Sequence, residues 1–251
     1  MKHVLEHIKA SVVINKKLLA ILIDPDKQNI EALPDFITLI KASVITHIFI
    51  GGSTVEAQRT ETLVLALKRL TDLPLVLFPG DVTQITEAAD AVLFLSLISG
   101  DNPDFLIGKH VKAARLLRNS NLEIIPTGYL LIESGAETAV QRVTKTQPLK
   151  NCKHTITDTA KAGELLGLQL IYLEAGSGAV NPVSGHVIKG VKNDLNIPLI
   201  VGGGIRSKQQ LDDAYAAGAD LVVIGTAFEN NNSFFEELES YSISGRFLKA
   251  R

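Results

Sequence analysis

The chain has little of what several protein classes require. Its 251 residues contain one cysteine, Cys152, so no internal disulfide can form and a reducing compartment, the cytoplasm, is the expected location. No uninterrupted apolar run approaches the roughly 18 residues of a membrane span. The start, MKHVLEHIKA, alternates charged with apolar residues and lacks the continuous apolar core of a signal peptide. The sequence therefore predicts a soluble protein, which leaves open a transient contact with a membrane surface.

Charge and motif content exclude further classes. The net charge is −2 and no polybasic run occurs, so the chain offers no basic surface for a nucleic-acid backbone. The six histidines show no zinc-site spacing, and no G-x-S-x-G elbow of an α/β-hydrolase is present. A phosphate-bearing ligand must therefore be held locally, by backbone amides, a metal or single lysines.

What the chain does contain is a regular alternation of apolar runs and helical patterns. Hydrophobic residues make up 46% and charged residues 21%, as in a globular protein. Strands are expected near residues 18–24, 47–53, 75–80, 91–100, 122–130, 170–179, 198–205 and 220–228. Helices are expected near residues 2–11, 30–42, 54–70, 103–118, 155–167, 183–195 and 207–217, with a last one from about 233.

This alternation predicts an α/β protein, a single (β/α)8 TIM barrel of the phosphate-binding type that spans residues 1–251. The link at 81–90 holds only a turn or two of helix, so one helix position is expected to be modified, and residues 133–152 are ambiguous. The alternative is a doubly wound sheet. Its first turn should carry G-x-G-x-x-G, whereas this chain has DPDKQN.

The segment LIYLEAGSGA at 170–179 passes from a buried strand into a loop of small residues. Glu174 lies at the break, and a carboxylate beside exposed backbone amides suits a proton acceptor next to an anion. The later loops VGGGI and VIGTA follow the seventh and eighth strands, where many barrels bind phosphate. The alternative is tight turns without a ligand, which the agreement of three loops disfavours. Tyr129 and Tyr172 end strands at the same face, as site residues or as core.

Polar residues also follow the first two strands. Asp24 is a candidate Mg²⁺ ligand, because magnesium prefers one or two carboxylates together with substrate phosphate oxygens, and Lys27 is a candidate phosphate partner. The alternative is a helix-capping turn, which is the favoured interpretation of Asp26. Ser53 either contacts a metal or phosphate, or caps a helix in a capping box with Glu56.

Six segments, in this order, resemble the geranylgeranylglyceryl phosphate synthase family over nearly the whole chain: IDPDK, FIGGS, PTGYLL, YLEAGSGA, VGGGIRS and ADLVVIGTAF. The intact IDPDK and the alanine-rich YLEAGSGA favour this branch over the related bacterial heptaprenylglyceryl phosphate synthases. The resemblance implies a (β/α)8 prenyltransferase. It would join sn-glycerol 1-phosphate to a polyprenyl diphosphate such as geranylgeranyl diphosphate, form an ether and release diphosphate, with Mg²⁺ as cofactor.

The resemblance also assigns residues by position. The magnesium positions correspond to Asp24 and Ser53. The glycerol-phosphate positions correspond to Tyr172, Leu173, Glu174, Ala175, Gly176, Ser177 and Gly178, and the phosphate-cradling pairs to Gly203 with Gly204 and Gly225 with Thr226.

The implied mechanism needs a base and an apolar groove. Glu174 is the candidate base for the attacking hydroxyl, with Tyr172 beside it, because it is the only carboxylate in the phosphate-rich segment. The groove walls are expected among apolar residues at or near strand ends, which are otherwise simple core: Phe78, Phe94, Leu95 and Leu97.

Two other functions remain as alternatives. A phosphosugar isomerase or lyase on the same barrel would share GGGI and IGTA but would need neither IDPDK nor an apolar groove. A binding barrel without chemistry would retain only the phosphate loops. The resemblance further suggests a homo-oligomer, and the sequence does not determine the prenyl chain length.

Overall fold

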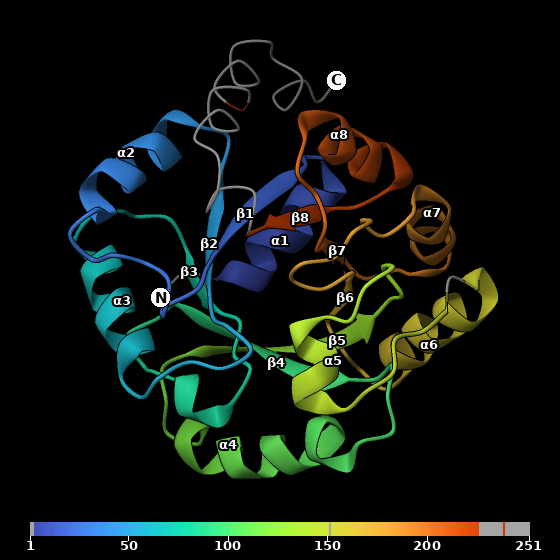
Figure 1. Cartoon of the computed structure of the whole chain (residues 1–251), viewed down its shortest axis with the longest axis horizontal. Helices are drawn as coiled ribbons and strands as arrows, with labels where there is room; N and C mark the ends of the chain where they lie inside the picture. The colour runs from blue at the N-terminus through green and yellow to red at the C-terminus, as the bar shows by residue number, and fades with distance from the viewer. Residues whose placement is uncertain (1–2, 151, 226–237, 239–251) are drawn as a thin grey trace.

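Eight parallel strands close into a barrel in the computed structural model of the chain, which describes residues 3–150, 152–225 and 238 (Figure 1). Each strand pairs with the next along the chain, and β1 closes the ring on β8 with Leu18 opposite Leu221. The strands are β1 (Leu18–Ile23), β2 (His47–Ile50), β3 (Leu75–Leu77), β4 (Ala91–Leu97), β5 (Glu123–Leu131), β6 (Leu170–Glu174), β7 (Leu199–Gly202) and β8 (Leu221–Ile224). The predicted (β/α)8 barrel is thereby confirmed.

Most helices surround the barrel on its outside, whereas the first one lies behind its centre in Figure 1. They are α1 (Val4–Val13), α2 (Leu33–Ala42), α3 (Arg59–Lys68), α4 (Lys109–Leu117), α5 (Ala139–Thr144), α6 (Lys153–Leu165), α7 (Gly185–Asp194) and α8 (Lys208–Ala217). The link after β3 holds only the 3-10 turn η1 (Val82–Gln84), so the expected modified position is real. A π-helical segment, η2 (Asp104–Gly108), precedes α4. The predicted helix from about residue 233 lies outside the described residues apart from Leu238, and the single domain over 1–251 stays a prediction.

Alternation along the strands separates two apolar layers. Because successive strand residues point to opposite faces, Leu18 and Ala20 belong to the cluster inside the barrel, while Leu19 and Ile21 pack outward beneath the helices. The same alternation on β6 turns Tyr172 inward and Leu173 outward. Continuing the inward series by two residues brings Glu174 to the carboxyl-terminal end of the barrel interior.

Helix α1 covers the opposite end of the barrel. Its Val4 and Ile8 side chains are buried within the interior cluster. The carboxylate of Glu123 accepts hydrogen bonds from the backbone N–H groups of Val4 (2.5 Å) and Leu5 (3.0 Å). A negative charge at the first turn satisfies amides that lack helical partners and complements the helix dipole. Helix α1 thus covers the amino-terminal end of the barrel among the described residues.

His47 is a buried histidine at this end of the barrel. Its Nδ1 lies 2.8 Å from the Thr46 hydroxyl, and its ring centroid is 5.3 Å from that of His7 on α1. The Nε2 atom is buried without a hydrogen-bond partner among the described residues. Burial, and then the charges of His7 and Lys16, lower the pKa of His47 to about 3, so the folded protein holds this ring neutral.

The contribution of His47 to folding stability is therefore expected to fall in mild acid. Above pH 6.5 the ring is neutral in both folded and unfolded chains. As the pH falls from 6.5 towards 3, only the unfolded chain takes up the proton, which favours unfolding. Between pH 7.5 and 5 this group should lower the free energy of unfolding by about 2 kcal/mol. Urea unfolding of the wild type and of His47→Gln at both pH values measures the difference. If the free energy of unfolding changes equally between the two pH values in both proteins, His47 does not make this contribution.

The helix cap predicted for Asp26 and the capping box considered as an alternative for Ser53 are not formed. Asp26 caps no helix, because its carboxylate accepts from the Glu56 backbone N–H at 3.2 Å and lies 3.6 Å from the Arg59 side chain. α2 begins at Leu33 without a side-chain cap. The capping box of Ser53 with Glu56 is also absent, since α3 begins only at Arg59. Ser53 is left free of that role and lies in the loop after β2.

Candidate active site

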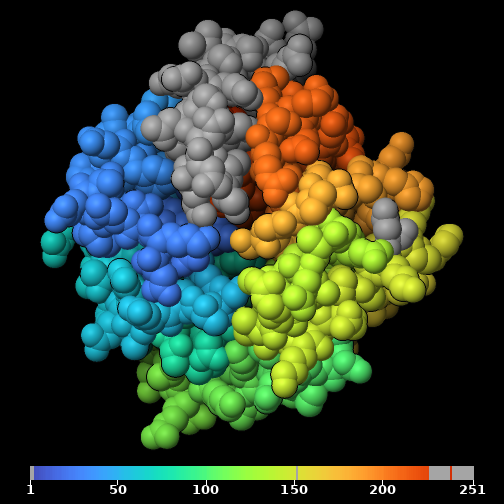
Figure 2. All heavy atoms as spheres, viewed as in Figure 1, coloured from blue at the N-terminus to red at the C-terminus, as the bar shows by residue number. Residues whose placement is uncertain are grey.

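A cavity of about 360 Å³ opens at the carboxyl-terminal ends of the strands. Loops that follow β1, β2, β3, β6, β7 and β8 contribute to its wall, together with η2, α4 and α5. In the space-filling view of this end, the blue and cyan units α2–α3 lie across the centre from the yellow-green α5 region (Figure 2). One part of the cavity is lined by polar groups and glycines and the other by apolar side chains.

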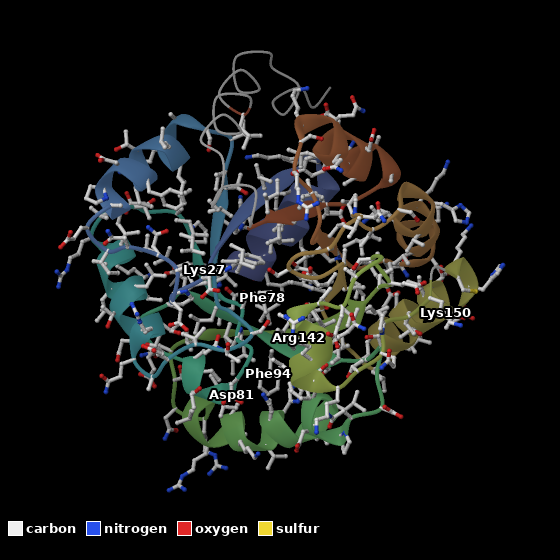
Figure 3. All side chains as sticks on the ribbon, viewed as in Figure 1. Lys27, Phe78, Asp81, Phe94, Arg142 and Lys150 are labelled. Carbon is white, nitrogen blue, oxygen red and sulfur yellow. The ribbon has the colours of Figure 1, made fainter. Side chains whose placement is uncertain are left out.

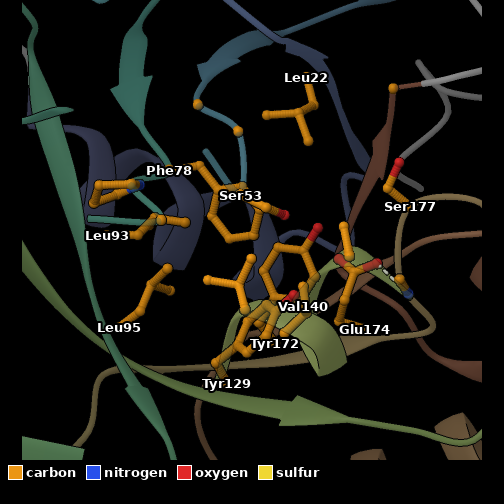
Figure 4. Close-up of a pocket in the computed structure, with 18 of the residues that line it drawn as sticks. Leu22, Ser53, Phe78, Leu93, Leu95, Tyr129, Val140, Tyr172, Glu174 and Ser177 are labelled. Carbon is orange, nitrogen blue, oxygen red and sulfur yellow. Dashed lines mark hydrogen bonds between the residues drawn. The ribbon is translucent and has the colours of Figure 1, made fainter. Parts of the chain in front are cut away.

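Glu174 is the buried carboxylate of the polar part. Its side chain projects into the cavity beside Tyr172 (Figure 4), and the residue is 6% exposed. The Gly176 backbone N–H donates to Oε1 at 2.6 Å, which fixes the carboxylate against the loop after β6. A carboxylate at this depth meets little water, so its charge is available to a bound ligand.

The pKa of Glu174 is raised to about 7. Burial is the largest cause, because a charged carboxylate is poorly solvated inside the protein. The Gly176 N–H and the Tyr172 hydroxyl oppose it, since both donate to the ionised form. Burial also raises the pKa of Tyr172 well above its usual value, so the phenol keeps its proton. Near neutral pH, Glu174 can therefore accept a proton, as a general base must.

Aromatic rings form the floor beneath this carboxylate. Phe78 stacks on Tyr172 with ring centroids 5.2 Å apart and an interplanar angle of 12°. Tyr129 lies 5.8 Å from Phe78 and 5.4 Å from Tyr172. All three line the cavity, so Tyr129 and Tyr172 are at once core and site residues. Such stacked rings hold one another in place, which fixes the Tyr172 hydroxyl at Glu174.

The glycine loops after β6 and β7 pack against one another at the same place. Gly203 has φ 81°, and a side chain there would overlap Glu174 Oε1 and the backbone of Gly176. Gly178 has φ 82°, and a Cβ added there would meet no other heavy atom within 4 Å. No hydrogen bond of the described residues uses the backbone N–H groups of Ser177 and Gly178. Free amides in a left-handed turn form an anion-binding concavity, as the phosphate prediction requires.

Asp24 and Ser53 lie across the cavity mouth from these loops. Asp24 is the inward residue that follows β1, and its carboxylate is 22% exposed. Its Oδ1 accepts from the Asp26 N–H at 3.1 Å, and Oδ2 lies 3.7 Å from Lys27 Nζ. Asp24, Lys27 and Ser53 all line the cavity. The turn that holds Asp24 is therefore an Asx turn, made by Asp24 itself.

These residues fit a magnesium ion that is shared with a substrate. No group of three or more His, Cys, Asp or Glu side chains within the described ranges could hold a metal alone. One carboxylate and one hydroxyl at an open mouth leave most coordination positions to water and to phosphate oxygens, which is the way Mg²⁺ is usually bound. A zinc or calcium cage would need more protein ligands.

Gln84 braces the loop that carries Ser53. It belongs to η1, is 2% exposed, and donates from Nε2 to the Gly52 carbonyl at 2.9 Å. Its Oε1 accepts from the N–H groups of Gly80 (3.2 Å) and Gly52 (3.4 Å). The short third link thus supplies a buried amide that joins the β2 and β3 loops. Sequence reasoning missed this residue because a glutamine in a short loop gives no indication of its partners.

The apolar part of the cavity extends between β4, η2, α4 and α5. Phe78, Phe94, Leu95 and Leu97 all line it, as expected of groove walls. Phe78 packs with the cluster inside the barrel, whereas Phe94 packs outside β4 against His110 of α4, with ring centroids 4.4 Å apart (Figure 3). Val140 of α5 faces Leu93 and Leu95 across the cavity (Figure 4). Lys109 fixes this wall, because its Nζ donates to the Gly80 carbonyl (2.9 Å) and Asp81 (2.7 Å).

Most predicted site residues that the structure describes line this cavity, and two of them do not. Leu173 packs outward under the helices, and Ala175 is buried with its backbone N–H bound to the Gly202 carbonyl at 3.0 Å. Neither lines the cavity. Thr226 lies outside the described residues. The residues that line the cavity are Asp24, Lys27, Ser53, Tyr172, Glu174, Gly176, Ser177, Gly178, Gly203, Gly204 and Gly225.

Comparisons with known proteins identify the family of this chain. Residues 12–241 match the model of the PcrB family. The geranylgeranylglyceryl phosphate synthase of Zunongwangia profunda is 58% identical over 92% of this chain and 98% of its own length, and that of Flavobacterium johnsoniae is 56% identical over 88% and 91%. A crystal structure of (S)-3-O-geranylgeranylglyceryl phosphate synthase from Thermoplasma acidophilum, in complex with its substrate sn-glycerol-1-phosphate, superposes with a TM-score of 0.90. It is 33% identical and covers 97% of this chain and 98% of its own.

Fold and cavity define an α/β-barrel enzyme with its site at the carboxyl-terminal face. Among the residues that the structure describes, no helix is long and apolar enough to cross a membrane. The chain belongs to the PcrB family, and within it to the geranylgeranylglyceryl phosphate synthases, which are prenyltransferases.

Proposed function

We propose that this enzyme transfers a polyprenyl group from its diphosphate to sn-glycerol 1-phosphate and forms an ether. One observation carries the proposal: the buried carboxylate of Glu174 lies between glycine loops suited to a phosphate and a cavity lined by apolar side chains. A phosphosugar isomerase would have no use for the apolar part. The Thermoplasma relative was crystallised with sn-glycerol-1-phosphate, which supports the same acceptor here.

The acceptor would bind by its phosphate. The free amides of Ser177 and Gly178 and the loop at Gly203 and Gly204 would hold the phosphate oxygens, and the β8 loop at Gly225 and Thr226 is proposed to complete this contact. The glycerol chain would then extend towards Glu174. Binding one end of the acceptor so that the other end meets the reacting carbon supplies much of the rate enhancement in such reactions.

The reaction then balances as a substitution at carbon. The free hydroxyl oxygen of glycerol phosphate forms a bond to the first prenyl carbon, which is allylic and carries positive charge as its bond to diphosphate breaks. The electron pair of that bond leaves with diphosphate. The hydroxyl proton passes to Glu174, whose pKa of about 7 lets it take and later release the proton. Tyr172 orients this carboxylate through its hydroxyl.

Asp24 and Ser53 would hold Mg²⁺ at the diphosphate end of the site. The ion would neutralise charge on the leaving group, which makes diphosphate easier to expel. Lys27, 3.7 Å from Asp24, would add a positive charge at the same place. The loop braced by Gln84 keeps Ser53 on this side of the cavity.

The prenyl tail would occupy the apolar part of the cavity. Each buried CH₂ contributes about 0.8 kcal/mol, so the walls at Phe94, Leu95 and Val140 would bind a long chain firmly. A homo-oligomer in the cytoplasm, in transient contact with a membrane through its lipid product, remains the expectation for the cellular form.

A product assay tests the proposal. The enzyme is incubated with Mg²⁺, with each enantiomer of glycerol phosphate, and with labelled prenyl diphosphates of several lengths. We expect one ether and one diphosphate per turnover with sn-glycerol 1-phosphate, and little product with the other enantiomer. Absence of an ether with every chain length would refute the transferase, and turnover of a phosphosugar would favour the isomerase.

A further inference from the structure

Arg206 is the first charged residue after the glycine loop of β7, and its backbone is fixed by the start of α8. The Arg206 N–H donates to Gln210 Oε1 at 2.7 Å. Ser207 is the N-cap of that helix and accepts from the Gln210 N–H at 3.3 Å. The amino-terminal turn of α8 therefore fixes the backbone of Arg206 beside the cavity, and its side chain extends from this fixed point.

That side chain reaches back to the loop after β6. Nη2 donates to the Ala179 carbonyl at 2.6 Å, and Nη1 to the Val180 carbonyl at a longer 3.5 Å. Ala179 is buried and Arg206 is exposed, so the shorter of the two bonds is partly buried. Arg206 also lines the cavity, as do Ser177 and Gly178 of the same loop. One guanidinium thus connects the two loops at which the acceptor phosphate is proposed to bind.

The loop after β6 needs such a connection. Its first residues are held by the bonds of the Ala175 N–H to the Gly202 carbonyl (3.0 Å) and of the Gly176 N–H to Glu174 (2.6 Å). Further along, the backbone makes few bonds, chiefly from the Ala179 N–H to the Gly176 carbonyl (3.1 Å) and from the Asn181 N–H to the Ser134 carbonyl (3.2 Å). Glycines in this loop allow many conformations that binding would have to restrict. Holding a loop in its bound form beforehand removes that entropy from the binding step.

We propose that Arg206 is a positioning residue for the acceptor phosphate. Its guanidinium orders residues 176–180, so that the free amides of Ser177 and Gly178 face the cavity, and adds a positive charge next to them. Identification of the anion as glycerol phosphate rests on the proposed function, whereas the ordering of an anion site does not. Lysine cannot replace arginine here, because an ammonium group is a point charge and lacks the planar fork that meets two carbonyls.

Two substitutions separate the fork from the charge. Arg206→Lys keeps the positive charge and loses the planar guanidinium group, and Arg206→Gln loses both. Lys208→Gln is the matched control, because it removes one positive charge two residues from Arg206. The Lys208 side chain pairs with Asp212 and does not line the cavity. Inorganic phosphate binding is followed by titration calorimetry and by its effect on thermal unfolding. Steady-state kinetics follow glycerol phosphate and prenyl diphosphate separately.

We expect Arg206→Lys to weaken phosphate binding and to raise KM for glycerol phosphate by about 10-fold or more, as the loss of a charge-assisted hydrogen bond predicts. The value of kcat at saturation and KM for the prenyl diphosphate should stay within about twofold, because only binding of the acceptor is affected. Arg206→Gln should weaken phosphate binding more than Arg206→Lys does. Lys208→Gln should bind phosphate like the wild type.

Three results would overturn the proposal: normal phosphate affinity in Arg206→Lys, equal weakening in Lys208→Gln, or a lower thermal stability with unchanged KM for glycerol phosphate. If Arg206→Gln does not fold, the comparison of Arg206→Lys with the control decides. If no ether product forms with any acceptor, the proposed function fails, and the phosphate titrations still decide the role of Arg206.

Discussion

Replacing Glu174 by glutamine is expected to lower kcat by about 10²- to 10⁴-fold, the usual contribution of a general base. Glutamine keeps the shape and the acceptor for the Gly176 N–H, which now binds Oε1 at 2.6 Å. It cannot take a proton from the attacking hydroxyl. Binding of glycerol phosphate, measured by calorimetry, should change little. Near-normal turnover in this variant would remove Glu174 as the base.

The same substitution has two consequences that depend on pH. Wild-type activity should fall as the pH drops below about 7, where Glu174 becomes protonated, and the residual activity of Glu174→Gln should lack this dependence. Folding stability should change in the opposite direction, because the contribution of Glu174 rises as the pH falls. A buried carboxyl whose pKa is raised favours the folded state below its unfolded value of 4.5, and this contribution is lost as the pH rises through 7. At pH 8 the variant should therefore unfold at a higher temperature than the wild type.

Replacing Asp24 by asparagine is expected to lower kcat/KM by about 10²-fold or more, because the metal bound there would supply several kcal/mol of charge stabilisation. The Mg²⁺ concentration for half-maximal activity should rise as well. Asparagine retains the acceptor for the Asp26 N–H, so the Asx turn should survive. Binding of Mn²⁺, followed by electron paramagnetic resonance with and without inorganic diphosphate, gives a second measure that does not depend on turnover.

Asp26→Asn is the control for this experiment. Asp26 is two residues away and carries the same charge, but it bonds to the Glu56 N–H and does not line the cavity. Its substitution should leave the magnesium requirement unchanged. If Asp24→Asn and Asp26→Asn behave alike, or if chelation of Mg²⁺ leaves wild-type activity intact, Asp24 is not a metal ligand.

The barrel could be predicted from the sequence because each buried parallel strand is a short continuous apolar run. The sequence also predicted that Asp24 and Glu174 lie at the same face, because both follow such runs and the carboxyl ends of parallel strands share one face of a barrel. The outward direction of Leu173 could also have been found, because Tyr172 and Glu174 both face inward and alternate with it. The assignment by family segment included Leu173 and overlooked the strand period.

Other features depend on contacts between distant residues. Asp26 was predicted to cap a helix from its local pattern, yet its carboxylate meets Glu56, 30 residues away. Gln84 and Arg206 likewise act on loops 32 and 27 residues away. No local propensity encodes such pairings, because they arise only when the closed barrel brings successive loops together.

A crystal structure of the enzyme with sn-glycerol 1-phosphate is the most direct test of the proposed site. We expect the phosphate at the backbone amides of Ser177, Gly178 and Gly204, with the free hydroxyl about 2.6–3.2 Å from a carboxylate oxygen of Glu174. A phosphate bound instead beside Asp24 and Lys27, or a glycerol hydroxyl turned away from Glu174, would contradict the assignment of acceptor and base.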